Sequence, residues 1–219
     1  MYVSRHHQMP EQAAMLDLID AHPLGAWVCH AASGLVANHI PFFLDRTRGT
    51  FGTLMGHVSR ANPVWTLLQA DTPSVILFQE AQHYITPNWY PGKAVHGRVV
   101  PTWNYSVAHA HGTARAIEDP QWLRTMLRQL TDAQEAGHPA PWRVADAPAE
   151  FIDQLMRGIV GIEIPIRQLE GKRKVSQDED LPDRLGTVQG LQSQGGEAAQ
   201  TMATLVRDAI APLDLKNHA

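Results

Sequence analysis

The sequence predicts a mainly β fold with helical additions. Apolar runs rich in β-branched and aromatic residues recur along the chain, turn-forming residues separate these runs, and helical periodicity is confined to the beginning, the middle and the end. The runs amount to about six or seven short strands. Because strands and helices do not alternate throughout, a small closed or half-open β-barrel is favoured over a parallel sheet.

Each element follows from a local pattern. Residues 10–21 predict a helix, since Pro10 suits a first helical position and Met15, Leu18 and Ile19 form an apolar stripe. Strands are predicted at residues 24–30, 34–44, 49–56, 73–79, 98–117 and 159–169. The turn at residues 32–34 (Ala-Ser-Gly) predicts a hairpin between the first two strands.

The remaining helices lie in the second half of the chain. Asp119-Pro120 opens a predicted helix that continues to about residue 136, and a shorter helix is predicted around residues 148–156. The tail from Asp178 onward is polar but helical, with a weak point in the glycine-rich stretch at residues 189–200. We therefore predict one domain over residues 1–178 and a C-terminal helical tail over residues 179–219.

Composition excludes several classes of protein. The chain has 219 residues, 44% of them hydrophobic and 18% charged, so a folded core is expected. Its net charge of −4 gives no bulk attraction to nucleic acid or to an anionic membrane. Cys29 is a lone cysteine, and no segment has the pattern of a secretory signal or a membrane span. We expect a cytoplasmic protein that does not enter membranes.

A candidate anion site follows the third predicted strand. Ser59 and Arg60 precede Asn62-Pro63, a pair that predicts the start of a helix. Free N–H groups at a helix start and a guanidinium fork both suit a phosphate group. The alternative is that Ser59 and Asn62 only cap the helix while Arg60 is solvated.

Three other groups of residues are candidates for contact with a ligand or a metal ion. Proline-rich sequence contains five aromatic residues that suit a stacking wall for a flat ligand, a dimer interface or a packed loop cluster: Tyr84, Trp89, Tyr90, Trp103 and Tyr105. A basic run at residues 172–174, with Arg167 near it, follows the last predicted strand and suits a phosphate or carboxylate site, a contact with a nucleic-acid backbone, or a solvated turn. His109 and His111 lie on one face of a strand, but no third ligand is recognisable at a useful spacing, so we predict no metal site.

Taken together, these segments resemble the PaiB-type family of FMN-binding negative transcriptional regulators, in the FMN-binding split-barrel superfamily of pyridoxamine-phosphate oxidase-like proteins. The matching segments occur in family order: MYVSRHH at 1–7, NHIPF at 38–42, GHVSRANP at 56–63, YITPNWY at 84–90, VPTWNY at 100–105 and KRKVSQ at 172–177. One departure is Asp178, where the family usually has Asn after Ser-Gln.

The resemblance implies a six-stranded Greek-key split β-barrel that forms a homodimer, with FMN in a groove between the subunits. The cofactor-binding residues that it implies are Asn38, His39, His57, Ser59, Arg60, Trp103, Asn104, Lys174, Ser176 and Gln177. Of these, His57, Ser59 and Arg60 would hold the flavin phosphate. Asp178 would repel a phosphate, so we expect either that it points away from the cofactor or that this contact is lost.

The resemblance implies a regulatory role, with DNA as a possible partner, although the sequence has no helix-turn-helix and no strongly basic helix. Two alternatives remain open. One is an FMN-dependent oxidoreductase that acts on a small molecule with a nicotinamide donor, and the other is a haem-binding split-barrel protein. Whether the protein is an enzyme stays open, and we name no catalytic residue; His83 and His109 are only candidates.

Overall fold

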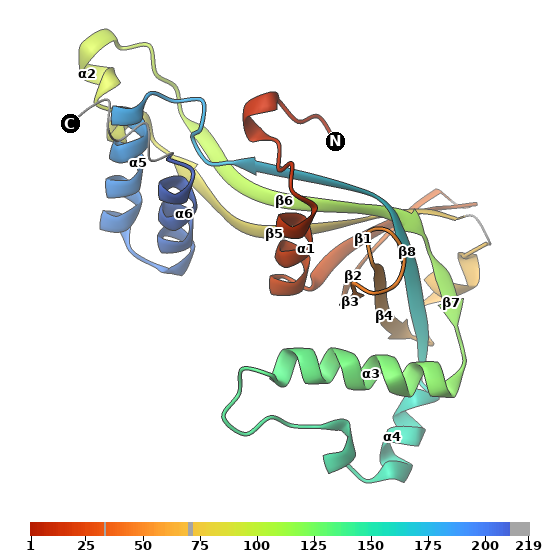
Figure 1. Ribbon diagram of the computed structural model, residues 1–219. Coiled ribbons are helices and arrows are strands. Elements are labelled where there is room, and N and C mark those ends of the chain that lie inside the picture. The colour runs from red at the N-terminus through yellow and green to blue at the C-terminus, as the bar shows by residue number, and fades with distance from the viewer. Residues whose placement is uncertain (33, 70–71, 211–219) are drawn as a thin grey trace. The chain divides into compact units, whose positions relative to one another are not determined.

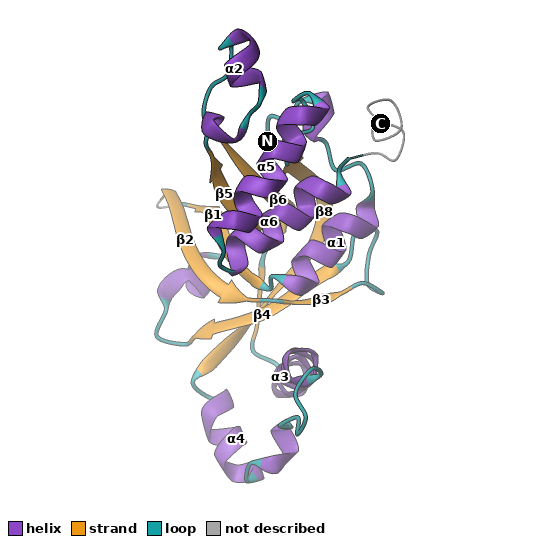
Figure 2. Cartoon of the chain, turned by 90° about the vertical axis from the view of Figure 1, so that its left-hand side faces the viewer, coloured by secondary structure: helices purple, strands orange, loops and turns teal. Residues whose placement is uncertain are grey.

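The computed structural model describes residues 1–32, 34–69 and 72–210. Its strands are β1 Leu24–Ala31, β2 Gly34–Pro41, β3 Phe43–Asp45, β4 Thr53–Ser59, β5 Pro73–Ile85, β6 Thr102–Thr113, β7 Arg115–Ile117 and β8 Ile159–Lys174. Its α-helices are α1 Gln12–Ala21, α2 Gly92–His96, α3 Pro120–Glu135, α4 Ala149–Met156, α5 Leu181–Gln194 and α6 Glu197–Asp208. Short 3-10 helices are η1 Arg5–His7, η2 Pro63–Leu67, η3 Pro87–Trp89 and η4 Val144–Asp146. Figures 1 and 2 show these elements.

The strands join in one sheet of eight, in the order β2-β1-β5-β6-β8-β4-β3, with β7 paired to β8. The class is therefore the mainly β split barrel with helical additions that the sequence predicts. The expected count of six strands is wrong for the described residues. The run at 34–44 divides into β2 and β3 at Phe42, and the run at 98–117 divides into β6 and β7 at Ala114.

The chain forms two compact units. One comprises residues 1–10, 79–107 and 171–219, and the other comprises residues 11–78 and 108–170. Strands β5, β6 and β8 continue from one unit into the other, because each contains residues of both. We describe the two units separately, as the 171–219 unit and the 11–78/108–170 unit.

In the 11–78/108–170 unit, β1 and β2 form the predicted hairpin. Their pairing runs from Leu24 with Pro41 to Ala31 with Gly34, and Ser33 of the predicted turn lies outside the described residues. Trp27 on β1 is fully buried, and its indole Nε1 donates a 3.0 Å hydrogen bond to Ser74 Oγ on the paired strand β5. This bond allows a large aromatic side chain to be buried without an unsatisfied donor.

Helices α3 and α4 of this unit pack on each other and on β4. Asp119 caps α3, since its side chain accepts a hydrogen bond from the Trp122 N–H at 2.7 Å. A buried cluster joins these elements: Met55, Leu123, Met126, Leu130, Ile152 and Met156. Both helices occur where the sequence predicts them, because each combines a proline-marked start with a strong apolar stripe.

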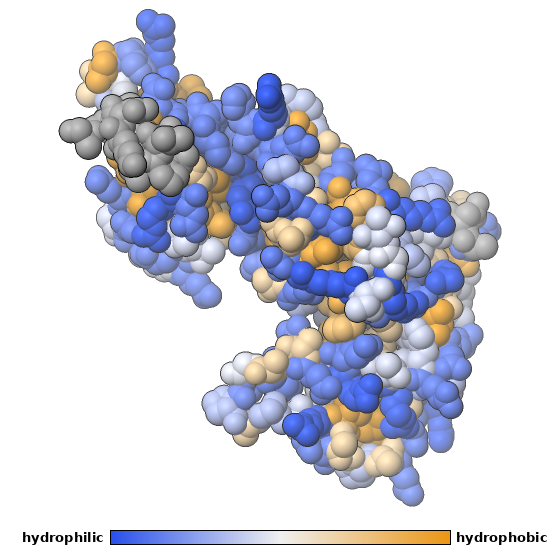
Figure 3. Space-filling view, in the orientation of Figure 1, coloured by the Kyte–Doolittle hydropathy of each residue, from blue (hydrophilic) through white to orange (hydrophobic). Residues whose placement is uncertain are grey.

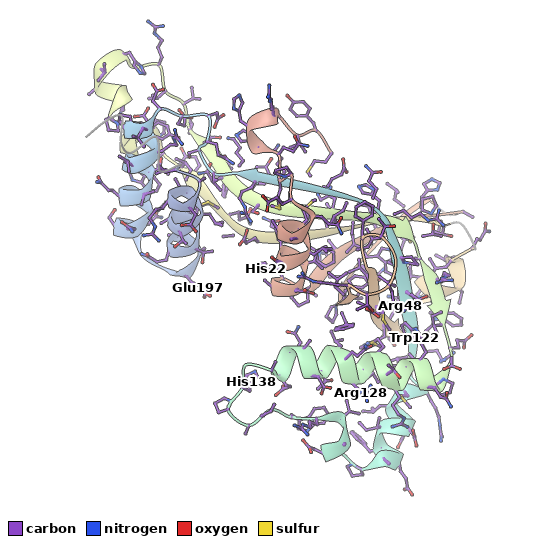
Figure 4. All side chains as sticks on the ribbon, in the orientation of Figure 1. His22, Arg48, Trp122, Arg128, His138 and Glu197 are labelled. Atoms are coloured by element: carbon purple, nitrogen blue, oxygen red, sulfur yellow. The ribbon has the colours of Figure 1, made fainter. Side chains whose placement is uncertain are left out.

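A buried carboxylate on β8 binds two arginines and the indole of Trp122 on α3. Glu163 on β8 is 4% exposed, and its oxygens lie 2.7 Å from Arg48 Nη2 and 2.5 Å from Arg115 Nη2. The indole Nε1 of Trp122 donates to the same carboxylate at 3.3 Å. Arg48 and Trp122 are labelled in Figure 4. Two cations therefore compensate the cost of burying this charge.

In the 171–219 unit, α5 and α6 lie side by side (Figures 1 and 2). Their inner faces pack against the ends of β5 and β8 in one buried cluster: Ile85, Tyr90, Val175, Val188, Leu191, Ala199, Met202, Ala203 and Val206. The visible outer side chains of these helices are mainly hydrophilic (Figure 3). The predicted weak point is confirmed, because the helices are separated at Gly195 and Gly196, both with positive φ.

Several predicted boundaries are wrong. Helix α1 begins two residues beyond Pro10, and residues 49–52 precede β4 instead of forming its start. The last strand was expected to end at residue 169, but β8 continues to Lys174, so the basic run is strand and not turn. The segment after Asn62 is a five-residue 3-10 helix instead of an α-helix. None of the described helices has the length and apolar character needed to cross a bilayer.

Candidate functional site

The ten predicted flavin-binding residues divide equally between the two units. Asn38, His39, His57, Ser59 and Arg60 belong to the 11–78/108–170 unit. Trp103, Asn104, Lys174, Ser176 and Gln177 belong to the 171–219 unit. Within each unit, hydrogen bonds link only part of the predicted set.

In the 11–78/108–170 unit, Asn62 joins β2 to the segment that follows β4. Its side-chain Nδ2 donates to Asn38 Oδ1 at 2.7 Å, and its Oδ1 accepts from the Val64 N–H at 3.0 Å. The second bond confirms that Asn62 caps the helix that starts at Pro63. Asn38 is thereby held beside the Ser59–Asn62 segment.

The N–H groups at this helix start are largely occupied. The Ala61 N–H donates to Ser59 Oγ at 3.3 Å, the Asn62 N–H donates to the Ser59 carbonyl at 2.9 Å, and Pro63 has no N–H. With the Val64 N–H bound to Asn62, few donors are left for a phosphate. A single 3-10 turn also has a much weaker dipole than the α-helix that the prediction assumed.

Arg60 is bound to its own chain. Its Nη1 lies 2.6 Å from Glu118 Oε2, its Nε donates to the Arg157 carbonyl at 2.9 Å, and its Nη2 donates to the Ile159 carbonyl at 3.2 Å. The guanidinium also lies 5.6 Å from the centre of the Trp65 ring. A phosphate at Arg60 would therefore have to displace Glu118 or share the guanidinium with it.

His57 has a buried polar atom that suits a missing ligand. It lies two residues before Ser59 on β4, so the two side chains share one face of the strand. Its Nδ1 is buried and has no hydrogen-bond partner among the described residues. Burial lowers the pKa of His57, which favours the neutral ring. A buried ring nitrogen without a partner is rare in a folded chain and suits a ligand contact.

His39 lies apart from this group. It follows Asn38 on β2, and successive side chains of a strand point to opposite faces of the sheet. Asn38 is half-buried and His39 is exposed, in agreement with this alternation. The two residues therefore do not reach one ligand from the same face of β2.

In the 171–219 unit, the same alternation separates Trp103 from Asn104 on β6. Trp103 is 54% exposed and meets Tyr84 edge-to-face, with ring centroids 6.0 Å apart. Asn104 is fully buried, and its Nδ2 donates to Ser176 Oγ at 2.9 Å. Its Oδ1 is buried without a partner among the described residues. Asn104 Oδ1 in this unit and His57 Nδ1 in the other unit are thus both buried polar atoms that lack a hydrogen-bond partner among the described residues.

The turn after β8 is held by its own side chains. Gln177 Oε1 accepts from the Val175 N–H at 2.7 Å, and its Nε2 donates to the Arg173 carbonyl at 2.6 Å. Lys174 Nζ donates to Thr102 Oγ1 on β6. Asp178 stands where the family usually has Asn. Its Oδ1 lies 3.3 Å from His7 Nε2, so its partner belongs to the same unit.

The predicted aromatic residues of this unit differ in burial. Trp89 and Tyr90 pack into the core of the unit, where Trp89 covers the glycines of α5. Burial, together with the nearby carboxylates of Glu179, Asp183 and Asp178, raises the pKa of Tyr90 to about 12. Tyr84 and Trp103 are the exposed pair. They retain the exposure that a stacking wall requires, and Tyr105, two residues after Trp103 on β6, is half-buried.

The structure also brings together residues that sequence reasoning missed. Glu170 Oε2 on β8 lies 2.8 Å from His111 Nε2 on β6, and His109 is close to both. Burial is the main cause that lowers the pKa of His109. A cavity of about 740 Å³ lies elsewhere, beside α3; Arg124, Arg128, Trp142, Arg143 and Ile152 are among its lining residues, and none of the ten predicted residues is.

The fold defines the class of the protein: a mainly β split barrel. A solved structure of the same fold, the FAD and haem binding protein of Mycobacterium smegmatis, matches with a TM-score of 0.56 and 18% identity over 77% of this chain and 73% of that one. Residues 1–168 match the family model described as "Putative FMN-binding domain", and the chain belongs to this family.

Two relatives match over nearly their whole length. An uncharacterised protein of Emericella nidulans is 32% identical over 95% of this chain and 97% of its own. The "Protease synthase and sporulation protein PAI 2" of Bacillus subtilis is 23% identical over 96% of this chain and 98% of its own. The second relative bears out the resemblance to PaiB-type proteins. Lys174, Ser176 and Gln177 lie beyond the segment that the family model matches.

Proposed function

We propose that the protein binds FMN as a homodimer and acts as a regulator of the PaiB type. The observation that carries the proposal is the match of residues 1–168 to an FMN-binding family. The unpartnered His57 Nδ1 and Asn104 Oδ1 support it, because a flavin offers both hydrogen-bond donors and acceptors for such groups.

The direct test is spectroscopic. The purified full chain is titrated with FMN, FAD and haem in parallel, and binding is followed by flavin fluorescence and by absorbance. We expect FMN to bind more tightly than FAD and haem. Tighter binding of FAD or haem would mean that the cofactor is not FMN but one of the two named for the Mycobacterium smegmatis protein. No binding of any of the three would contradict the proposal.

Arg60 provides the sharpest test of the phosphate position. We expect Arg60→Ala to weaken FMN binding by roughly 1.5–3 kcal/mol, the scale of a hydrogen bond to a charged group. Glu118→Gln should leave FMN affinity unchanged or raise it, because it removes the charge that competes for Nη1. The dissociation constants are measured by fluorescence titration.

Arg46→Ala is the matched control for this experiment. Arg46 has the same side-chain exposure as Arg60, 39%, and is likewise held by carboxylates, those of Asp17 and Asp20. Its loss should leave FMN affinity unchanged. If Arg60→Ala also leaves the affinity unchanged, Arg60 is only a structural ligand of Glu118 and of the carbonyls of residues 157 and 159.

The assembly and the regulatory role need separate measurements. Light scattering should give about twice the chain mass of 24.2 kDa for a homodimer. Mobility shifts on promoter fragments test DNA binding, and binding that ignores sequence would remove the regulatory role. Anaerobic mixing with NADH or NADPH tests the reductase alternative through bleaching of the flavin. The cytoplasm remains our proposed location.

The basic run gives limited support to DNA contact. Lys172 Nζ lies 5.2 Å from the centre of the Tyr105 ring, Arg173 Nη2 lies 3.7 Å from Glu80 Oε2, and Lys174 is bound to Thr102. Phosphate contacts would have to compete with these internal partners. If the protein binds DNA through this run, we therefore expect the affinity to be low and strongly dependent on salt.

A further inference from the structure

Two neighbouring strands bring three metal-ligating side chains together in the 11–78/108–170 unit. His109 and His111 lie on β6, and Glu170 lies on β8, which is next to β6 in the sheet. One ligand atom of each residue lies within 4.8 Å of those of the other two. None of the three belongs to the flavin-binding set proposed above.

The backbone fixes the direction of both histidines. Ala108 and Ala110, which alternate with them on β6, are fully buried. Because side chains alternate along a strand, His109 and His111 both point to the opposite face, where they are half-buried. Glu170 is also half-buried, so the cluster is partly shielded from water and still accessible to an ion from solution.

We propose that His109, His111 and Glu170 bind a divalent transition-metal ion of the zinc class. Two imidazole nitrogens and one carboxylate oxygen suit zinc and its neighbours, whereas magnesium and calcium prefer oxygen ligands alone. Three protein ligands leave a coordination position for water, as in zinc sites that are open to solvent.

One pair of the proposed ligands has nearly the spacing that a bound ion requires. His111 Nε2 and Glu170 Oε2 are 2.8 Å apart, and two ligands of a tetrahedral zinc ion at about 2.0–2.1 Å are about 3.3 Å apart. For this pair, a side-chain shift of about half an ångström would let the ion replace the direct contact, and the ligand atom of His109 lies within 4.8 Å of both. The contact between His111 and Glu170 gives no role to His109, which lies on the same face of β6.

The test uses the full chain without an affinity tag. Zn²⁺ binding is measured by calorimetry, and Co²⁺ binding by the visible absorption that reports coordination geometry. We expect one ion per chain at this site. His109→Gln, His111→Gln and Glu170→Gln should each weaken binding by at least about tenfold. His138→Gln is the control, because His138 is exposed beyond the end of α3 (Figure 4).

A second measurement needs no variant and so does not depend on how the variants fold. Diethyl pyrocarbonate modifies accessible histidines, and mass spectrometry locates the modified residues. Zn²⁺ should protect His109 and His111 and leave the modification of His138 unchanged. Absence of binding, or binding that none of the three substitutions weakens, or equal protection of all three histidines, would overturn the proposal. Because the readouts involve no flavin, they are independent of the proposed function.

Discussion

At the residue scale, Ser176 has a conformation that its neighbours must stabilise. Its φ of 62° is the only positive φ of a non-glycine residue in the described ranges, and its side chain is nearly fully buried. A left-handed conformation costs an L-residue about 1–2 kcal/mol. The hydrogen bond from Asn104 Nδ2 to Ser176 Oγ offsets this cost and ties the turn after β8 to β6.

Two substitutions separate the strain from the hydrogen bond. Ser176→Ala should lower the free energy of unfolding by about 1–3 kcal/mol, because the buried Asn104 amide loses its acceptor. Ser176→Gly loses the same bond but relieves the backbone, so it should be about 1 kcal/mol more stable than Ser176→Ala. Urea unfolding measures both. Equal stability of the two variants would mean that the left-handed conformation carries no cost here.

The sequence does not predict which residues of the candidate site share a face of their strand. Asn38-His39 and Trp103-Asn104 are adjacent in the printed sequence, but strand alternation sends each pair to opposite faces. Glu170 is 59 residues from His111 and became a neighbour only through strand pairing. The sequence signal that could have found it is the last predicted strand, had it been extended past residue 169.

At the scale of elements, the contact between η3 and α5 depends on the absence of a side chain at Gly190. A Cβ placed on Gly190 would lie 2.2 Å from the Trp89 ring, which is closer than real side chains approach. In an exposed helix, Gly→Ala stabilises by up to about 1 kcal/mol. Here we expect Gly190→Ala to destabilise the protein, because the rigid indole must move out of the core.

Thermal unfolding of Gly190→Ala in the native chain and in a Trp89→Leu chain tests this explanation, with Gln192→Ala as the control. Gln192→Ala on the exposed face of α5 should have little effect, since the side chain of Gln192 is exposed and the hydrogen bond from Gln200 reaches only its backbone carbonyl. In a Trp89→Leu background, Gly190→Ala should become neutral or stabilising, because the ring that it meets is gone. If Gly190→Ala is as harmful there as in the native background, the glycine is needed for a reason other than the contact with Trp89.

Element types were more predictable than element lengths. The hairpin β1–β2 and helices α3 and α4 follow from local turn and capping signals, which act within a few residues. Strands β5 and β8 extend beyond their apolar runs, by six residues in β5 and five in β8. The extensions contain polar side chains such as Lys172, because pairing with neighbouring strands supplies backbone hydrogen bonds whatever the side chains are.

At the scale of the whole molecule, the polar character of the C-terminal tail is misleading. Helix α5 has a weak apolar stripe, and yet Leu191 and Val188 are buried with Ile85, Tyr90 and Val175 of earlier elements. The small residues Gly186 and Gly190 allow close approach to Trp89, which hydropathy does not record. The helices thus complete the core of the 171–219 unit.

This packing leads to a test of the expected boundary at residue 178. A chain that ends at Asp180 loses α5 and α6 and exposes the apolar side chains of Ile85, Tyr90 and Val175, so it should bind the dye ANS and aggregate. A chain that ends at Gly195 keeps α5 and should unfold at an intermediate temperature, because Leu191 still covers part of the cluster. Calorimetry and light scattering of the three lengths measure the order. If the chain ending at Asp180 is monodisperse and unfolds cooperatively at the temperature of the full chain, residues 1–178 fold independently of the tail.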